Sequence, residues 1–260
     1  MAAKLGEIQT TASDACLHIN IGKTKVMRLN TTNYQKFQID NADLEDVQSF
    51  IYLSSVISAT AGSRENITNR IKKANQAFAA LQKVWKSPQI HLKTKLHLFS
   101  SNVRSVLLYG CESWNTTASD LQSLQVFINR SLRKLLKIFW PNVISNRDLW
   151  ERAGETPIRN QIIIHKWSWI GHVLRRTNDN VAKMAIDWNP QGSRRRGRPA
   201  NTWRRQIETE ANLTGKSWAE VKLIADHNGK TLLWPFVPPW NHRNQYNILL
   251  EMKNGSTTIT

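Results

Sequence analysis

Two groups of basic side chains have the residue types and the spacing to bind phosphate. The first is a run in which arginines surround Gly197 and end at Pro199; its members are Arg194, Arg195, Arg196 and Arg198. A glycine lets the backbone approach the floor of a narrow DNA minor groove, whose negative potential attracts the flanking arginines. Trp203 could stack on a base nearby or cover apolar surface. The run predicts nucleic-acid contact, and a solvated basic loop or a nuclear-import signal is the alternative.

The second group follows one side of a predicted helix. Its members stand at positions i, i+3, i+4 and i+7 and are Arg130, Arg133, Lys134 and Lys137. Like charges at this spacing repel each other by roughly a few tenths of a kcal/mol per pair. Phosphate would neutralise them, which favours a nucleic-acid surface. An ordinary solvated face explains the spacing equally well.

The net charge of the 260-residue chain is +17, and the middle of the sequence carries all of it. Residues 61–160 hold 16 basic and 6 acidic side chains, and residues 161–205 hold 10 and 2. The segments on either side are close to neutral. A field of this sign attracts polyanions, of which nucleic acid is the commonest and anionic lipid the next. RNA, DNA or both are therefore the predicted partners, without sequence specificity.

Composition excludes several other classes of protein. No apolar run approaches the length of a membrane span, and the first residues lack the pattern of a secretory signal. We therefore expect no membrane partner and an intracellular location, with nucleus and cytoplasm both open. The two cysteines, Cys16 and Cys111, cannot form a disulfide framework.

The sequence contains little that is typical of catalysis. His165 and His172 lie seven residues apart on one predicted helix, and Cys111 is remote from both, whereas a zinc site needs further ligands at known spacing. We therefore predict no metal site. No Gly-rich phosphate loop, Ser/His/Asp arrangement or catalytic Cys motif is present.

Periodicity predicts an α+β fold that is mostly helical. Apolar spacing of three and four residues predicts helices, at 3–16, 64–85, 92–107, 121–138 and 156–174. Alternation and β-branched enrichment predict short strands, as a hairpin or two strands in 18–30, then at 37–40 and 47–58. Residues 141–155 and 189–203 are expected to be a connector and a loop, and Ser217 with Glu220 forms a capping box.

Six segments in order resemble the reverse transcriptases of non-LTR retrotransposons, of the RTE/CR1-like endonuclease–reverse transcriptase type. HINIGKTKVM at 18–27 resembles motif D, and FIYLSSVIS at 50–58 resembles the primer-grip hairpin. RENITNRIKKANQAFAALQKVW at 64–85 with LLYGCESW at 107–114 resembles the thumb. WSWIGHVLRR at 167–176 and SRRRGRPANTWRR at 193–205 resemble the C-terminal region.

The resemblance implies a domain plan of four parts. A small β-hairpin remnant of the palm is expected at 1–60, a helical thumb bundle at 61–140, a basic helical C-terminal module at 141–227, and a flexible tail at 228–260. An exposed palm face would also favour self-association or pairing with other polymerase parts.

Three residues match positions with known roles in this family. Lys23 matches the motif-D lysine, which is thought to protonate the leaving pyrophosphate; a loop lysine paired with a neighbour is the alternative. Tyr52 and Leu53 match the primer grip, and membership of the hairpin core is the alternative for both. Ser54 stands where the family has glycine.

The sequence departs from the family at the catalytic metals. Polymerisation uses two Mg²⁺ ions held by palm aspartates, and this sequence has no Asp-Asp pair. The carboxylates Asp43, Glu45 and Asp46 are expected to be solvated rather than metal-bound. The predicted function is therefore nucleic-acid binding without polymerisation, no enzyme activity in the isolated chain, and no cofactor. A catalytic subunit completed by another chain, or an inert truncated transposon product, are the alternatives.

Overall fold

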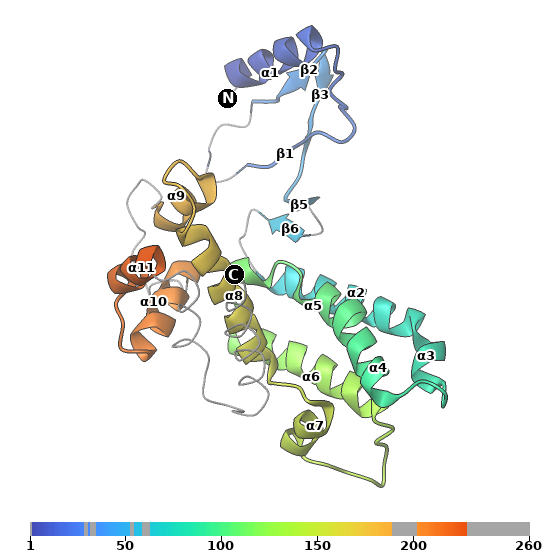
Figure 1. The fold of residues 1–260 in the computed structure, drawn as a ribbon. Coiled ribbons are helices and arrows are strands. Elements are labelled where there is room, and N and C mark those ends of the chain that lie inside the picture. The colour runs from blue at the N-terminus through green and yellow to red at the C-terminus, as the bar shows by residue number, and fades with distance from the viewer. Residues whose placement is uncertain are drawn as a thin grey trace, which may run out of the picture. The chain divides into compact units, whose positions relative to one another are not determined.

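The computed structural model describes residues 2–28, 31, 35–52, 55–58, 63–188 and 202–227. The fold is α+β and mostly helical, as predicted (Figure 1). The chain divides into two compact units, Met1–Asn66 and Ile67–Thr260. The predicted division at 60/61, 140/141 and 227/228 stays a prediction.

Among its described residues, the first unit holds helix α1, three two-stranded pairs and the first turn of α2 (Ser63–Ala80) (Figure 1). Helix α1 spans Ala2–Asp14. The strands are β1 (Lys25–Val26), β2 (Gln38–Ile39), β3 (Ala42–Asp43), β4 (Glu45–Asp46), β5 (Ser49–Tyr52) and β6 (Ser55–Ser58). Strands β1 and β4 pair in parallel, and the other two pairs are antiparallel.

Of the hairpin or pair of strands predicted within 18–30, the described residues 18–28 form one short strand and a turn. The side-chain oxygen of Asn20 accepts a hydrogen bond from the Lys23 N–H, and the backbone carbonyl of Asn20 accepts one from the Thr24 N–H. These bonds close a turn. A side chain that bonds nearby backbone competes with strand pairing. Within residues 18–28, Lys25–Val26 forms the strand, and it pairs with Glu45–Asp46 rather than with a neighbouring segment of 18–28.

The predicted strands at 47–58 form the hairpin β5–β6. Phe50 lies opposite Ile57, and Tyr52 lies opposite Ser55. Asn66, at the start of α2, grips the second strand: its side-chain amide donates to the Val56 carbonyl at 2.9 Å, and its amide oxygen accepts from the Val56 N–H. The hairpin is thereby tied to the beginning of the helical region.

The second unit begins with helices that are less continuous than predicted. The helix predicted at 64–85 is split at Leu81 into α2 (Ser63–Ala80) and α3 (Gln82–Lys86). The helix predicted at 92–107 comprises α4 (Leu92–Leu98), the π-helical segment η1 (Phe99–Arg104) and α5 (Ser105–Leu108). Buried Lys95 closes the α3–α4 turn by donating to the carbonyls of Trp85 and Ser87.

A 3₁₀ turn, η2 (Cys111–Ser113), leads to the central helix α6 (Ala118–Leu135). Thr117 and Asp120 form a capping box at its start. The predicted apolar stripe is buried and joins α2–α5 in one hydrophobic cluster, through Leu124, Ile128, Leu132 and Leu135. Burial of this stripe is the main source of the helix's stability, because isolated helices are marginal in water.

The connector predicted at 141–155 contains a helix, α7 (Asn146–Ala153). Ser145 caps it by accepting from the Asp148 N–H, and Gly154 ends it with a φ of 64°. Helix α8 (Ile158–Leu174) follows, with Pro157 at the N-cap. The apolar pattern of the sequence did not indicate α7, because this helix is short and polar and only two of its residues are buried.

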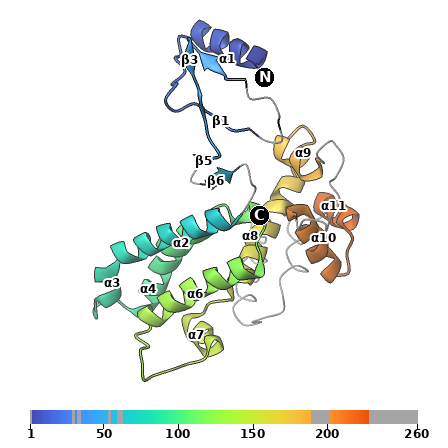
Figure 2. The ribbon, with the colours of Figure 1, turned by 180° about the vertical axis from the view of Figure 1, so that it is seen from behind.

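The final described helices form a second hydrophobic cluster on α8. The cluster is formed by α10 (Trp203–Leu213) and α11 (Trp218–His227), which pack together, and α11 contacts α8 (Figure 2). Helix α9 (Val181–Asp187) lies between α8 and α10 in the sequence and contributes no residue to this cluster. The capping box of Ser217 and Glu220 is confirmed by reciprocal hydrogen bonds. Helix α8 contributes Ile158 and Ile162 to the first cluster and Trp167 and Ile170 to the second.

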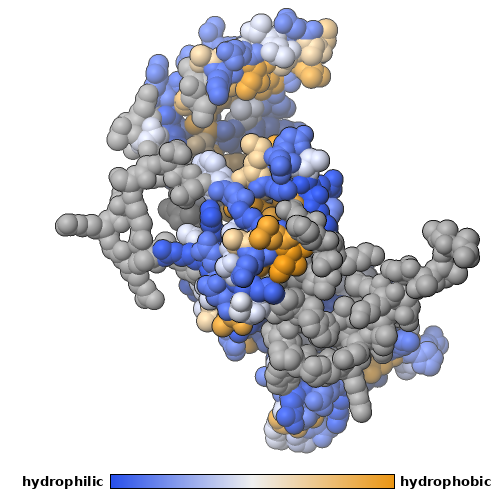
Figure 3. Space-filling view, turned by 60° about the vertical axis from the view of Figure 1, so that its left-hand side comes forward, coloured by the Kyte–Doolittle hydropathy of each residue, from blue (hydrophilic) through white to orange (hydrophobic). Residues whose placement is uncertain are grey.

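Hydrophilic residues predominate among the described residues on the face shown in Figure 3, and apolar ones form small patches. Among the described helices, none is long and apolar enough to cross a membrane.

Candidate nucleic-acid interface

The predicted basic stripe of α6 is one residue shorter than expected. Arg130, Arg133 and Lys134 lie on the helix, whereas Lys137 lies beyond its end with a φ of 55°. The Ile138 N–H donates to the Arg133 carbonyl, which is the bond of a Schellman motif with lysine at the left-handed position usually taken by glycine. The chain therefore turns away from the helix axis before Lys137, which the periodicity could not show.

The three helical cations line an open hollow of about 580 Å³ beside α6 and α7. No carboxylate lines it among the described residues. Its other lining residues are Gln122, Gln125, Val126, Asn129, Ile138, Phe139, Asn146 and Trp150. We call this feature the α6–α7 groove. Its walls offer cationic and amide groups with apolar surface between them, a mixture suited to a phosphate backbone and its bases.

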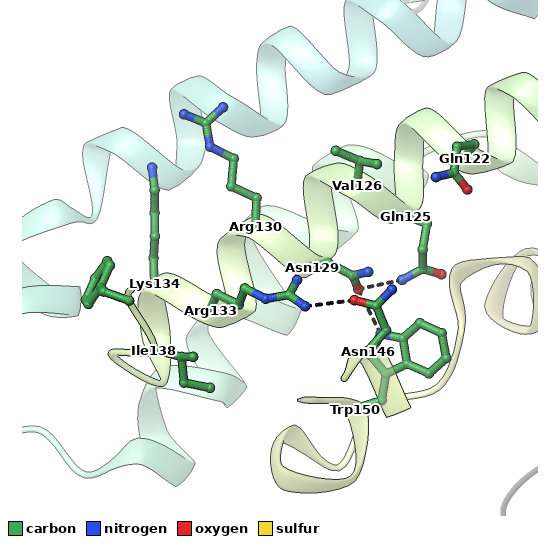
Figure 4. Close-up of a pocket in the computed structure, with 11 residues that line it drawn as sticks. Gln122, Gln125, Val126, Asn129, Arg130, Arg133, Lys134, Ile138, Asn146 and Trp150 are labelled. Carbon is green, nitrogen blue, oxygen red and sulfur yellow. Dashed lines mark hydrogen bonds between the residues drawn. The ribbon is translucent and has the colours of Figure 1, made fainter. Parts of the chain in front are cut away.

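The cations of the groove do not all play the same part (Figure 4). The Arg133 guanidinium points toward α7, where it donates to Asn146 Oδ1 at 2.8 Å and to the Ile144 carbonyl at 3.4 Å. Arg130 and Lys134 extend away from α7 in the same view. Neither forms an ion pair within the part of the chain that the structure describes, although Lys134 Nζ lies 5.8 Å from the Phe78 ring centroid. Arg133 therefore helps to position the groove, and the other two are available to a polyanion.

A buried amide network holds the groove in shape. Asn129 Oδ1 accepts from Gln125 Nε2 at 2.9 Å and from Trp150 Nε1 at 2.8 Å (Figure 4). The Gln125 side chain also accepts from the Ile158 N–H at 2.8 Å, at the start of α8. One turn of α6 thus fixes both α7 and α8, so the groove is preorganised.

Exposed aromatic side chains follow the cations, and the sequence analysis missed them. Phe139 is 60% exposed and Trp140 is 88% exposed, in the segment that joins α6 to α7. An aromatic pair directly after a basic helix, Phe-Trp-Pro at 139–141, is the signal that could have identified them. Base stacking on such rings contributes about 1–3 kcal/mol per base.

Trp203 has a packing role in the structure. It begins α10, its indole N–H donates to the Glu112 carbonyl at 2.7 Å, and its ring meets Trp169 edge-on at 6.0 Å. Contact between Trp203 and nucleic acid stays a prediction. The run Arg194, Arg195, Arg196 and Arg198 lies outside the described residues.

Lys23 and Tyr52, two of the family-matched residues of the first unit, are exposed. Lys23 lies in the turn after Asn20 and forms no ion pair among the described residues. Tyr52 is 58% exposed, so it does not belong to a buried hairpin core, and Leu53 lies outside the described residues. The roles implied for Lys23 and Tyr52 stay predictions.

The acidic cluster of the first unit is paired with cations rather than simply solvated. Glu45 pairs with Lys25, Asp46 with Arg28 at 2.9 Å, and Asp43 with Lys36 at 2.5 Å. The Lys36 ammonium and the Gln38 amide, both bonded to Asp43, lower the pKa of that carboxyl.

In a second polar region, near α8, the charged side chains are paired with one another. Lys166 is 2% exposed and donates to Glu210 Oε1 at 2.8 Å, and Trp167 Nε1 donates to Glu210 Oε2 at 2.7 Å. Arg104 pairs with Glu155, which is 8% exposed, and burial raises the pKa of this carboxyl despite the guanidinium.

The expectation that Cys111 is remote from both histidines is wrong for His165. Cys111, Glu112 and His165 bring their potential ligand atoms within 4.8 Å of one another. Burial raises the pKa of the Cys111 thiol to about 12. Only tertiary packing of η2 against α8 creates this cluster, so the spacing along the sequence carried no signal for it.

Comparison with known proteins gives a coarse assignment. Residues 77–109 match the model of a domain of unknown function, DUF6451. Over 215 residues the chain is 26% identical to an uncharacterized transposon-derived protein of Caenorhabditis elegans. The aligned region covers 79% of this chain and 77% of that protein. No solved structure matches the chain significantly. These similarities support a transposon-related origin.

Proposed function

We propose that this chain binds nucleic acid as the thumb and C-terminal portion of a retrotransposon-encoded RNA-directed DNA polymerase. The α6–α7 groove carries this proposal: Arg130 and Lys134 are available to phosphate, and no described carboxylate lines the groove. Phe139 lines it, and the next residue in the sequence, Trp140, is exposed. The net charge of +17 supports the same partner. Transposon-related origin makes nucleic acid the natural substrate class.

The mixture of cations and free aromatic rings favours a single strand or a strand end. Duplex binding needs only phosphate contacts, whereas stacking on Trp140 needs an unpaired base. Because Arg130 and Lys134 are one helical turn apart, they can contact neighbouring phosphates of one backbone. Contacts of this type are independent of sequence.

The proposal includes binding without polymerisation by the isolated chain. Two-metal phosphoryl transfer needs carboxylates that hold both ions, and the acidic cluster at 43–46 is committed to ion pairs with lysine and arginine. Primer extension with the purified chain and Mg²⁺ tests this part. Incorporation above background would show instead that the chain is a catalytic subunit.

The groove is tested by salt-dependent binding of the full chain to a fluorescent single-stranded RNA, with DNA and duplex as parallel probes. The variant Arg130→Ala/Lys134→Ala removes the two available cations. We expect the slope of log affinity against log salt to fall by about 0.7 for each lost contact with a single strand. Affinity at low salt should fall for all sequences alike.

The matched control removes two cations from the neighbouring helix α7. Arg147 and Arg152 are exposed there but do not line the groove. The variant Arg147→Ala/Arg152→Ala changes the net charge equally and should leave most of the slope intact. Equal losses in the two double variants would show that only overall charge matters, and would remove the groove from the proposal.

A further inference from the structure

The cluster of Cys111, Glu112 and His165 lies apart from the α6–α7 groove and plays no part in the proposed function. Gly110 precedes it with a φ of 75°, a left-handed conformation that residues with a side chain adopt only with strain. This turn starts the 3₁₀ segment Cys111–Ser113, which packs against α8. Helix α8 supplies His165. Local backbone geometry and helix packing therefore bring the three side chains together.

The three donors form a set that divalent transition metals prefer. A thiolate, an imidazole and a carboxylate are all zinc ligands, whereas Mg²⁺ selects oxygen ligands alone. In a tetrahedral site with bonds of about 2.0–2.3 Å, ligand atoms are separated by about 3.5 Å. His165 Nδ1 and Glu112 Oε1 are already 3.8 Å apart, and all three donors lie within 4.8 Å. Small side-chain rotations of Glu112 and His165 would close the remaining distance.

The burial of the three groups is graded from one side to the other. The cysteine is fully buried, whereas the side chains of Glu112 and His165 are 30% and 53% exposed. The two exposed ligands can adjust to an incoming ion, and the sulfur is shielded from oxidants and water. A fourth ligand would come from the solvent side, as a water molecule.

The neighbouring charge does not block a cation. The ammonium of Lys166 acts electrostatically on Cys111, but Glu210 Oε1 accepts its hydrogen bond at 2.8 Å. Its charge is therefore largely compensated within the α8–α10 contact. Glu112 adds a carboxylate beside the cysteine that no lysine or arginine pairs with among the described residues; its near neighbour is His165 itself.

We propose that Cys111, Glu112 and His165 form a three-ligand site for one thiophilic divalent cation of the Zn²⁺ class. Binding replaces the thiol proton with the metal and releases that proton to solvent. A role of Cys111 as a nucleophile fits the geometry less well, because the sulfur is inaccessible and such catalysis needs an exposed thiolate.

The site would join the two hydrophobic clusters of the second unit. Cys111 belongs to the cluster built on α2–α8, and His165 lies on α8 between Ile163 and Trp167 of the other cluster. The carbonyl of Glu112 also accepts from Trp203 of α10. A bound ion would therefore restrain α8, η2 and α10 together, and its binding free energy would add to folding stability.

The test uses the full chain and Co²⁺ as a spectroscopic substitute for Zn²⁺. We expect one equivalent of Co²⁺ to produce a thiolate-to-cobalt charge-transfer band, which Zn²⁺ displaces. The band should survive in Cys16→Ser, since that cysteine is exposed in the first unit, and should disappear in Cys111→Ser. Zn²⁺ at a hundred times its dissociation constant should raise the Tm by about 5–10 °C.

Two exposed-ligand variants keep the test valid if Cys111→Ser fails to fold. Glu112→Gln and His165→Gln should each weaken Co²⁺ binding by at least 10- to 100-fold, the loss seen when even an outer partner of a ligand is removed. The control is His172→Gln on the same helix, whose ring interacts with Arg176, and it should bind as the parent does. Absence of the band, its loss in Cys16→Ser, or unchanged affinity in both Glu112→Gln and His165→Gln would overturn the proposal.

Discussion

Two regions of the second unit are rich in basic and aromatic side chains, and they use them in opposite ways. In the α6–α7 groove, Arg130 and Lys134 have no ion-pair partner among the described residues. Trp140, in the segment that follows α6, is almost fully exposed. At the α8–α10 contact, Lys166 and Trp167 are buried and both donate to the carboxylate of Glu210. The two regions differ because Glu210 lies within hydrogen-bond distance of Lys166 and Trp167, whereas no described carboxylate lines the groove.

The contrast explains why composition alone could not separate a binding surface from a polar core. A buried cation is tolerated only with a partner that repays its desolvation. An exposed cation with no partner costs little in the free protein and gains a partner when phosphate arrives. The position of carboxylates is therefore more informative than the density of lysine and arginine.

The largest expected effect comes from removing the buried carboxylate. Glu210→Ala leaves the Lys166 ammonium and the Trp167 N–H without their acceptor in a site where Lys166 is 2% exposed. We expect a loss of about 3–5 kcal/mol in the free energy of unfolding, measured by urea denaturation. Glu208→Ala, which removes a half-exposed i,i+4 partner of Arg204 on the same helix, is the control and should cost under about 1 kcal/mol. Similar losses of unfolding free energy in the two variants would contradict the distinction between the internally paired α8–α10 contact and the unpaired cations of the α6–α7 groove.

The helical plan could be predicted wherever a stripe was long or a cap was explicit. The apolar positions of α6 and the capping box of Ser217 and Glu220 agree with the structure. Helix α7 was missed because its eight residues are mostly polar and exposed, so its hydrophobic signal is short. The turn at Asn20 was missed because a side-chain amide, rather than hydrophobic pattern, decides the backbone there.

The candidate site was predicted in part. The cations of α6 were identified from their spacing. The different role of Arg133, which positions the groove, could not be predicted, because its partner Asn146 lies on α7, a helix that the sequence did not reveal. Lys137 left the stripe because of a backbone turn after Leu135. The juxtaposition of Cys111 with His165 depends on packing across more than fifty residues of sequence. Such contacts are set by tertiary structure, which local periodicity does not encode.

The next largest effect concerns the open region. Trp140→Ala should weaken binding of single-stranded nucleic acid by about 1–3 kcal/mol through lost base stacking, and duplex binding much less. Because the side chain is 88% exposed, the free energy of unfolding should change by less than about 0.5 kcal/mol. Fluorescence anisotropy and urea denaturation measure the two quantities. Trp188→Ala, which removes a 66% exposed ring remote from the groove in sequence, is the control. A parallel loss on duplex would indicate that Trp140 does not stack on bases.

The smallest effect is a pH dependence of stability at the pair of Arg104 and Glu155. This pair is intermediate between the unpaired cations of the α6–α7 groove and the buried Lys166–Glu210 pair, because Glu155 is buried but Arg104 offsets only part of its desolvation. Burial raises the pKa of Glu155 above its ordinary value of 4.5, while the Arg104 charge and a hydrogen bond from Gln161 oppose that shift. A raised folded-state pKa contributes stability that is fully present below the unfolded value and is lost as pH rises through the folded value. The stability of the parent relative to Glu155→Gln should therefore decrease as pH rises from below 4.5 toward neutral, as measured by urea midpoints for both proteins. If the difference instead grew with pH, the attraction of Arg104 would outweigh desolvation, and this pair would belong with the fully compensated Lys166–Glu210 contact.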